Sequence, residues 1–266
     1  MSQPKVKSSR VGTFLTQVKK NRQIYFLLIF GIIWYVVFAY FPMYGLTLAF
    51  KQYRAVDGIF GSPWVGTQVF EYVFRDPAFF EAVYRTLWIN IGRMIFQFPI
   101  PVILALLLNE VRLGKSKKVL QSVFTFPHFL SWIIVSSIML NVLGSQGILN
   151  SFIKLLGGEP VSIIGNSDTF VPLLYITENW KSAGWSAIIY MASIAGIDQE
   201  QYEAAEIDGA SRFQRMIHIT LPGIQVTVTV MFILAAGNLM TAGFDQVFNL
   251  SNPATSKVAE TLDMYI

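Results

Sequence analysis

The chain has no cysteine, and charged residues make up only 14% of its 266 residues. The absence of cysteine excludes disulfides and thiolate metal sites. A soluble domain usually carries about 25% charged residues, so the low charge argues against one large soluble core. Only two histidines are present, His128 and His218, and their separation fits no metal-ligand spacing. Because no catalytic triad or pair of catalytic carboxylates is apparent either, we expect no enzyme activity, metal or cofactor on this chain.

Hydrophobic residues make up 53% of the chain and lie in long blocks. A membrane-spanning helix needs about 20 apolar residues, and only helices satisfy their backbone hydrogen bonds across lipid at this length. The sequence therefore predicts an all-α polytopic membrane protein with five spans. The first block is too long for a cleaved signal peptide and is expected to be a permanent anchor. The blocks cover about residues 24–41 (uncharged as far as 50), 87–108, 119–143, 170–197 and 224–239.

Basic residues gather in three places, which are residues 1–23, the loop after the second block and the loop after the fourth. By the positive-inside rule these segments are cytoplasmic, and segments 51–85, 144–169 and 240–266 are external. The predicted organisation is a basic cytoplasmic N-terminus over 1–23 and a membrane domain over 24–266. Five spans would leave the C-terminus outside, so we expect that the sequence is truncated before a sixth span. The basic residues are Lys5, Lys7, Arg10, Lys19, Lys20, Arg22, Arg112, Lys115, Lys117, Lys118, Arg212 and Arg215.

A polar segment over residues 198–222 separates the fourth and fifth blocks. Asp198 and Ser211 are each followed three residues later by glutamine, as in a capping box, so each is expected to start a short helix. Gly209 suits the left-handed position that ends the first helix. Pro222 is expected to end the second. From periodicity alone, this hairpin either packs on the membrane domain or meets a partner.

The spacing of the hairpin resembles the EAA loop of ABC importer permeases. The resemblance extends over about residues 20–266 to carbohydrate-uptake permeases of the binding-protein-dependent type, above all those of Gram-positive bacteria that import oligosaccharides or polysaccharide fragments. Asp245 stands where a glutamate is expected, and the family usually has six spans. The loop residues are Glu203, Ala204, Ala205, Gly209, Ile219, Leu221 and Pro222. The similar stretches are FAYFPMYGLTLAF (38–50), QFPIPVILALLLNEVR (97–112), FPHFLSWIIV (126–135), HITLPGI (218–224) and GFDQVFNLSNP (243–253).

The resemblance implies a type I importer transmembrane domain in a bacterial cytoplasmic membrane, with ATP bound and hydrolysed by a partner. The loop would dock into a cytoplasmic ABC ATPase subunit, with Glu203 in a salt bridge to it, Ala204 and Ala205 allowing close approach, and Gly209 providing the bend. Pro222 would set the return into the membrane. The implied partners are the ATPase pair, a second homologous permease, an extracellular substrate-binding lipoprotein and membrane lipid, but no nucleic acid.

Polar residues inside the apolar blocks are candidates for a substrate path, because polar groups in lipid usually face the bundle interior. Arg93 lies in the second block, and Glu178, Trp180 and Lys181 lie near the start of the fourth. Glu178 and Lys181 are three residues apart and can pair on one helix face. Arg93 can alternatively extend to the membrane interface, and the tryptophans can serve as interfacial anchors.

Other functions remain open from the residues alone. The loop motif also fits an ABC permease for amino acids or peptides. A secondary transporter should show intramembrane carboxylates, which are scarce here, and an embedded enzyme should show clustered catalytic groups. Residues 114–116 read Gly-Lys-Ser, but position 109 is Asn where a phosphate-binding loop needs Gly, so we interpret them as a basic turn.

Overall fold

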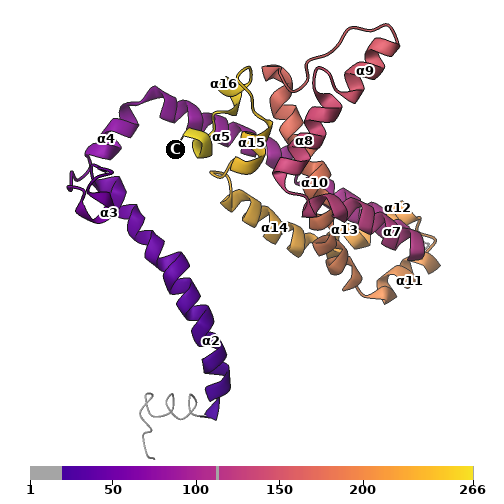
Figure 1. The fold of residues 1–266 in the computed structure, drawn as a ribbon. Helices are drawn as coiled ribbons and strands as arrows, with labels where there is room; N and C mark the ends of the chain where they lie inside the picture. The colour runs from indigo at the N-terminus through magenta and orange to yellow at the C-terminus, as the bar shows by residue number, and fades with distance from the viewer. Residues whose placement is uncertain (1–19, 112–113, 266) are drawn as a thin grey trace, which may run out of the picture. The chain divides into compact units, whose positions relative to one another are not determined.

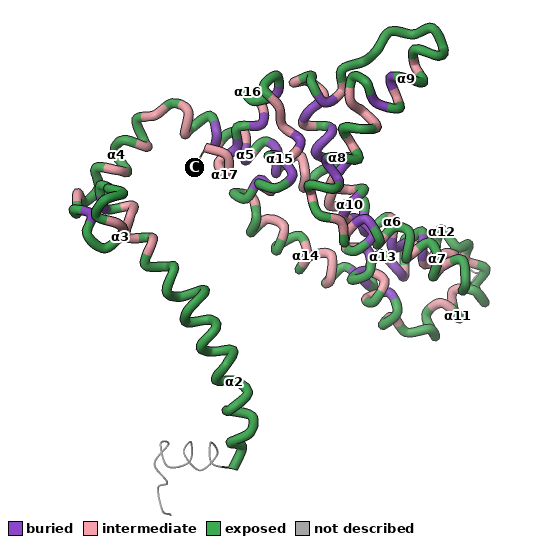
Figure 2. The backbone as a smooth tube through the Cα atoms, in the orientation of Figure 1, coloured by how far each residue is buried: buried purple, intermediate pink, exposed green. Residues whose placement is uncertain are grey.

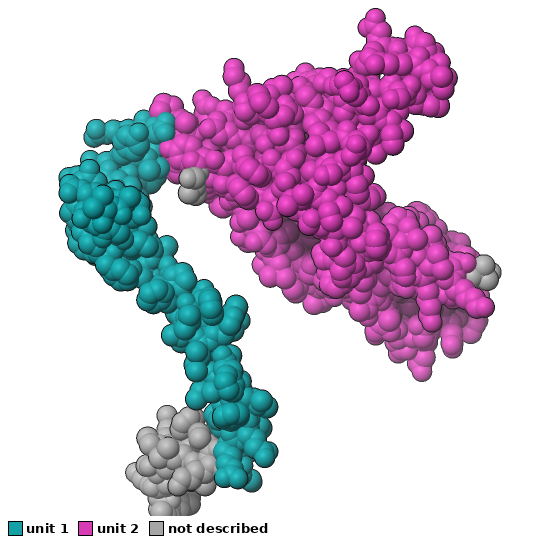
Figure 3. All heavy atoms as spheres, in the orientation of Figure 1, with its two compact units in different colours: residues 1–76 teal, residues 77–266 magenta. Residues whose placement is uncertain are grey.

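The computed structural model describes residues 20–111 and 114–265, and it forms two units that divide at Asp76 (Figure 3). The regular elements in these ranges are helices, and the only β-bridge described there is an isolated one between Lys51 and Trp64. The predicted all-α membrane fold is therefore confirmed. The predicted cytoplasmic residues Lys5, Lys7, Arg10, Lys19 and Arg112 lie outside the described residues.

Unit 1 consists of one long apolar helical run followed by a small folded segment. The run is α2 (Arg22–Tyr35), η1 (Val36–Tyr40) and η2 (Phe41–Phe50), and it matches the first predicted span and its extension to Phe50. None of its residues is buried within the chain, and Figure 2 shows α2 exposed along its length. The remaining helices of the unit are α3 (Gly58–Gly61) and α4 (Gln68–Arg75).

The loop after η2 is fastened by one buried lysine. The Lys51 side-chain amine donates to the carbonyl oxygens of Ile59 (2.9 Å) and Phe60 (3.3 Å), and it lies 4.9 Å from the centroid of the Trp64 ring. A lysine is rarely this buried unless its charge is compensated, and here carbonyl groups and aromatic faces compensate it. The contact folds residues 51–64 into a compact turn.

Unit 2 contains the remaining helices, which Figure 1 labels along the chain. They are α5 (Pro77–Phe96), α6 (Pro99–Glu110), α7 (Gly114–Thr125), η3 (Phe126–Phe129), α8 (Trp132–Leu143), α9 (Ile148–Leu155), α10 (Ser167–Ala195), α11 (Gln199–Ile207), α12 (Arg212–Arg215), η4 (Met216–Thr220), α13 (Leu221–Gly223), α14 (Gln225–Gly237), α15 (Phe244–Leu250), α16 (Ser256–Ala259) and α17 (Leu262–Tyr265). The Gly-Lys-Ser stretch opens helix α7, so its interpretation as a turn was wrong.

Three helical runs in the described ranges are long and apolar enough to cross a membrane, or four if one bent pair counts as a span. They are Arg22–Phe50, Pro77–Glu110 and Trp132–Leu155, and the bent pair joins Arg212–Gly223 to Gln225–Gly237. The second run begins at Pro77, earlier than predicted, and breaks between α5 and α6, where Pro99 has no N–H to continue the ladder.

The third predicted span, 119–143, is not one helix. α7 ends at Thr125, η3 contains Pro127, and the chain is extended at Leu130. Ser131 then caps α8, because its side chain accepts a hydrogen bond from the Ile134 N–H at 3.4 Å. The crossing-length run in this region therefore begins at Trp132.

The fourth predicted span is α10, the 29-residue helix at the centre of unit 2. It is long enough to cross a bilayer, since each residue adds about 1.5 Å. It is not among the three apolar runs because polar residues such as Thr177 and Lys181 lower its hydropathy. Both of these side chains are buried in the protein. The face of α10 that packs on protein does not need to be apolar, whereas its exposed face carries Ile176, Ile188 and Ile189.

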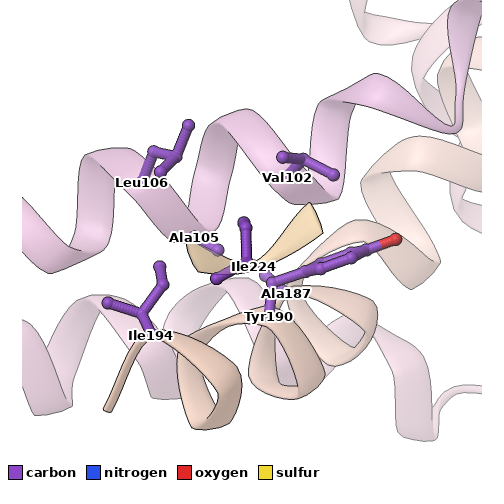
Figure 4. Packing of buried hydrophobic residues seen from close by; sticks show 7 residues of the cluster. All are labelled: Val102, Ala105, Leu106, Ala187, Tyr190, Ile194 and Ile224. Atoms are coloured by element: carbon purple, nitrogen blue, oxygen red, sulfur yellow. The ribbon is translucent and has the colours of Figure 1, made fainter. Parts of the chain in front are cut away.

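Two buried apolar clusters hold the unit together. The first packs α6 on α10 and includes Ile224, which Figure 4 shows among the side chains of those two helices. The second joins α5 and α10 to the C-terminal segment 240–266, which the sequence predicted only as an external loop. Its buried members are Ile89, Phe170, Leu174, Val247, Leu250 and Ala259.

Candidate coupling loop and transport cavity

The two short helices of the hairpin at 198–215 begin where predicted, although the reciprocal box expected between Asp198 and Gln201 does not form. Asp198 accepts a hydrogen bond from the Glu200 N–H at 3.0 Å and starts α11. Gly209 has φ +78°, the left-handed conformation that glycine adopts without steric cost. Ser211 and Gln214 form a reciprocal capping box at the start of α12. Local sequence therefore determines both helices and the turn between them.

The second helix ends one residue after Pro222, close to the predicted end. The helical run continues from α12 through η4 and α13 to Gly223, and the bend of 59° to α14 follows there. η4 is a π-helical turn directly before Leu221. Proline lacks an N–H and its ring crowds the carbonyl four residues back, and a π turn is one way in which a helix accommodates such a disruption. The chain therefore changes direction at Ile224, between α13 and α14.

Two side-chain contacts brace the hairpin, and the sequence patterns did not reveal them. Arg215 Nη1 lies 2.7 Å from Glu206 Oε2, which joins α12 to α11. The Tyr202 hydroxyl lies 2.9 Å from Thr220 Oγ1, which joins α11 to η4. Thr220 is buried, so this second contact is shielded from solvent. The two helices are thus linked at two points.

The predicted coupling residues lie mostly on the exposed side of this hairpin. Glu203, Ala204 and Gly209 are exposed, as are Leu221 and Pro222, whereas Ala205 and Ile219 are half-buried. Within the described residues, Glu203 forms no ion pair. Large apolar side chains are exposed beside it, with Ile207 at 86% and Phe213 at 65%. Exposed apolar residues next to an unpaired carboxylate are typical of a protein-binding surface.

The end of the hairpin is packed tightly against the membrane domain. Ile224 is fully buried in the α6–α10 cluster (Figure 4). A Cβ atom added to Gly223 would lie 2.6 Å from Cδ1 of Ile197, so only glycine fits this approach without a shift. The end of the hairpin is therefore joined to α6 and α10 by direct side-chain packing.

A cavity of about 530 Å³ lies in unit 2, within the 300–1,000 Å³ range of ligand pockets. Helices α5, α6, α8, α10 and α14 surround it, together with the segment after α14. Its lining mixes apolar side chains with hydrogen-bonding groups. The polar lining residues are Asn90, Arg93, Gln97, Glu178, Asn179, Ser182, Ser186, Tyr190, Asn238, Thr241 and Gln246, and Trp132 adds an indole.

Of the three path residues predicted from the sequence, Arg93 and Glu178 line this cavity and Trp180 does not. Trp180 is 43% exposed. Trp185 also lies outside the lining and stacks on His128, with ring centroids 4.7 Å apart. The aromatic residues that line the cavity are instead Phe98, Trp132 and Tyr190, and sequence reasoning missed all three.

The predicted Glu178–Lys181 pair does not form. Glu178 accepts a hydrogen bond from Ser182 Oγ at 2.7 Å. Lys181 Nζ instead donates to the His128 carbonyl oxygen at 2.8 Å and lies 5.6 Å from the Trp132 ring centroid. That carbonyl belongs to the last turn of η3, where the α7–η3 run ends and cations are favoured. Lys181 therefore fixes the break between α7 and α8.

Apolar membrane-length helices around a polar cavity, with an exposed braced hairpin joined to the same core, define a membrane transport subunit. Residues 97–245, more than half of the chain, match the family described as binding-protein-dependent transport system inner membrane component. The chain belongs to this family and is a transport permease.

Curated relatives and solved structures agree with this assignment. The protein LplB of Bacillus subtilis is 41% identical over 96% of this chain and 80% of that protein. The polygalacturonan/rhamnogalacturonan transport system permease protein YteP of the same organism is 39% identical over 98% and 81%. The crystal structure of a bacterial ABC transporter involved in import of the acidic polysaccharide alginate is 33% identical with a TM-score of 0.85, covering 95% of this chain and 85% of that one.

Proposed function

We propose that this chain is the permease subunit of an ATP-driven importer that carries an oligosaccharide across the bacterial cytoplasmic membrane. The observation that carries the proposal is the hairpin at 198–222, which exposes Glu203 unpaired at one end and enters the α6–α10 core through Ile224 at the other. Such a rigid element can pass a partner's movement into packed helices. ATP would be bound and hydrolysed by that partner, a separate cytoplasmic ATPase.

The remaining partners follow from the same assembly. A second homologous permease would complete the path, and a substrate-binding lipoprotein would deliver the sugar outside. A related solved structure is an alginate ABC transporter in complex with an alginate pentasaccharide-bound periplasmic protein, 33% identical with a TM-score of 0.83. The N-terminus and the hairpin would both be cytoplasmic, as the basic residues around them favour.

The cavity of unit 2 would form part of the sugar path. Glu178, Asn179 and Ser182 offer hydrogen-bonding groups along one side of α10, and Trp132 offers an aromatic face. A few polar groups in a largely apolar wall are typical of sites that recognise small polar ligands. An oligosaccharide is favoured over amino acids or peptides because similar permeases carry polygalacturonan, rhamnogalacturonan and arabinooligosaccharides in their names.

The test replaces Glu203 by lysine in the importer assembled with its ATPase and binding protein in vesicles. We expect that Glu203→Lys inserts normally but abolishes ATP-dependent oligosaccharide uptake and loses the co-purified ATPase, because the charge that would meet a basic partner is reversed. Gly209→Pro should behave in the same way, since proline cannot adopt φ +78°. The matched control is Glu159→Lys, a charge reversal at an exposed acid outside the hairpin. Normal uptake and normal ATPase association in both hairpin variants would refute the proposal.

A further inference from the structure

The chain between α14 and α15 is not helical, although it continues an apolar span. α14 ends at Gly237, α15 begins at Phe244, and Gly243 between them has φ +76°. Asn238, Leu239, Thr241 and Gly243 all line the cavity of unit 2. Non-helical backbone at membrane depth is tolerated only where protein or a wet cavity satisfies its polar groups. Segment 238–243 therefore needs hydrogen-bond partners from outside its own helix.

Helix α5 supplies those partners to the carbonyl groups of the segment. Asn90 Nδ2 donates to the carbonyl oxygens of Leu239 (2.8 Å) and Thr241 (3.3 Å). Arg93 Nη1 donates to the Ala242 carbonyl oxygen at 2.7 Å. The Ala242 N–H is held from the other side by Asp263 Oδ2 at 2.8 Å. Side chains thus replace the backbone hydrogen bonds that the break removes.

Arg93 also connects the segment to the central helix. Its Nη2 donates to Gln246 Oε1 at 2.7 Å, and Gln246 Nε2 donates to the Leu174 carbonyl oxygen (2.7 Å) and to Thr177 Oγ1 (2.9 Å). Gln246 is 1% exposed, so these bonds are formed away from solvent. The fork of one guanidinium thereby links α5, the break, α15 and α10.

The guanidinium is also covered by the break itself. A Cβ atom on Gly243 would lie 3.6 Å from both Nη1 and Nη2 of Arg93, so the backbone of Gly243 is close to the guanidinium. Nη1 is further engaged by Asn90 Oδ1 at 3.1 Å. The Nε atom is buried without a hydrogen-bond partner. Nη1 donates to two protein acceptors and Nη2 to one, which leaves little of the guanidinium for a sugar.

We propose that Arg93 is a positioning residue of the transport path, which holds segment 238–243 in the cavity wall and does not contact the sugar. This proposal rests on the proposed function for one point, that the cavity is part of a transport path. The hydrogen bonds of Arg93 to segment 238–243 and Gln246 do not depend on it. Asn90 and Gln246 act with Arg93. Asn90 bonds other carbonyl groups of segment 238–243, and Gln246 connects Arg93 to α10. Helix α5 then shapes the cavity wall by hydrogen bonds to the backbone of segment 238–243. The shape of this wall therefore does not depend on whether the substrate is charged.

The test combines local hydrogen exchange with transport, using Arg93→Met and Arg93→Lys in the assembled importer. In Arg93→Met, amide exchange of a peptide covering 238–246 should rise about tenfold or more, because charge-assisted hydrogen bonds are lost, while exchange within α10 stays unchanged. Arg93→Lys should not restore protection, because a single ammonium lacks the planar fork that reaches both Ala242 and Gln246. The matched control is Arg85→Met on the same helix, whose partners are Glu81 and Glu260; it should leave 238–246 unchanged.

Transport distinguishes positioning from substrate contact. In Arg93→Met, uptake of a uronate-containing oligosaccharide and of a neutral one should fall by the same factor, because the wall is altered and no sugar group loses a partner. A selective loss of the acidic sugar would show that Arg93 contacts substrate and would overturn the proposal. Unchanged exchange at 238–246, equally faster exchange throughout unit 2, or full restoration by Arg93→Lys would also overturn it. If the wild-type assembly moves no oligosaccharide, the proposed function fails, while the exchange measurement still decides the role of Arg93.

Discussion

Ile224 is the point at which the hairpin enters the membrane core, so truncating it should disconnect the two. The side chain is 0% exposed and packs in the cluster formed by α6 and α10. Replacing a buried isoleucine by alanine costs about 2–5 kcal/mol, the transfer term plus the cavity left behind. Taking about 3 kcal/mol for Ile224→Ala, the apparent melting temperature should fall by roughly 6–12 °C for a chain of this size. The cavity should also let the hairpin move without carrying α6 and α10.

The assay measures thermal unfolding in detergent and, separately, sugar transported per ATP hydrolysed in reconstituted vesicles. Ile224→Ala should lower both the melting temperature and the transport ratio. The matched control is Ile233→Ala, the same chemical change on α14 at a side chain that is 63% exposed, where both quantities should change little. If Ile224→Ala keeps the wild-type ratio of sugar to ATP, the reasoning that motion passes through this contact is refuted, whatever happens to the melting temperature.

Two further predictions concern α10. A Cβ atom on Gly184 would lie 2.1 Å from the Phe124 carbonyl oxygen, so Gly184→Ala should push α7 away, cost about 1–3 kcal/mol or more, and lower the melting temperature and the yield. The control Gly237→Ala should be neutral, because no atom lies within 4 Å of its Cβ position. A Gly184→Ala variant as stable as this control would contradict the packing described. Lys181→Met should lower the free energy of unfolding by about 1.5–3 kcal/mol, because the hydrogen bond to the His128 carbonyl oxygen is lost. The control Lys257→Met, at an exposed site, should leave the free energy of unfolding unchanged. Equal melting temperatures for the two variants would argue against that hydrogen bond.

The elements that depend on local chemistry were predictable. The caps at Asp198 and Ser211 and the turn at Gly209 follow from side chains and backbone freedom within a few residues, and the structure forms all three. Long apolar blocks likewise predicted the all-α class and the first span, because a helix without protein packed around it must be apolar along its length to cross lipid.

The features that depend on distant contacts were not predictable. The third span was misplaced because hydropathy does not register the break at Leu130, which Lys181 of α10 fixes from far along the chain. Segment 240–266 was read as a loop, although its short helices pack on α5 and α10. Asn90 bonds a carbonyl oxygen of the broken span and Gln246 bonds one of α10, and neither role is recognisable until those carbonyl groups are placed.

For the cavity, the sequence indicated intramembrane polarity but not which groups face inward. Arg93 and Glu178 were singled out as costly polar residues, and both line the cavity. Trp132 carried no distinguishing signal, because its neighbours are mostly apolar, whereas Trp180 stood out because Asn179 and Lys181 flank it. A partner for Lys181 could not be assigned by spacing along one helix, since its acceptor is a backbone carbonyl on another element.

The central claim, that the hairpin docks a cytoplasmic ATPase, can be tested directly because the chain has no cysteine. A single cysteine replacing Ile207, which is 86% exposed, would carry a thiol-linked photo-crosslinker in the assembled importer within native membranes. A cysteine replacing Leu155, 81% exposed on α9, provides the matched position outside the hairpin. The account predicts an adduct at 207, identified by mass spectrometry as the ABC ATPase subunit, and none with that subunit at 155. An ATPase adduct at 155 but not at 207 would contradict it.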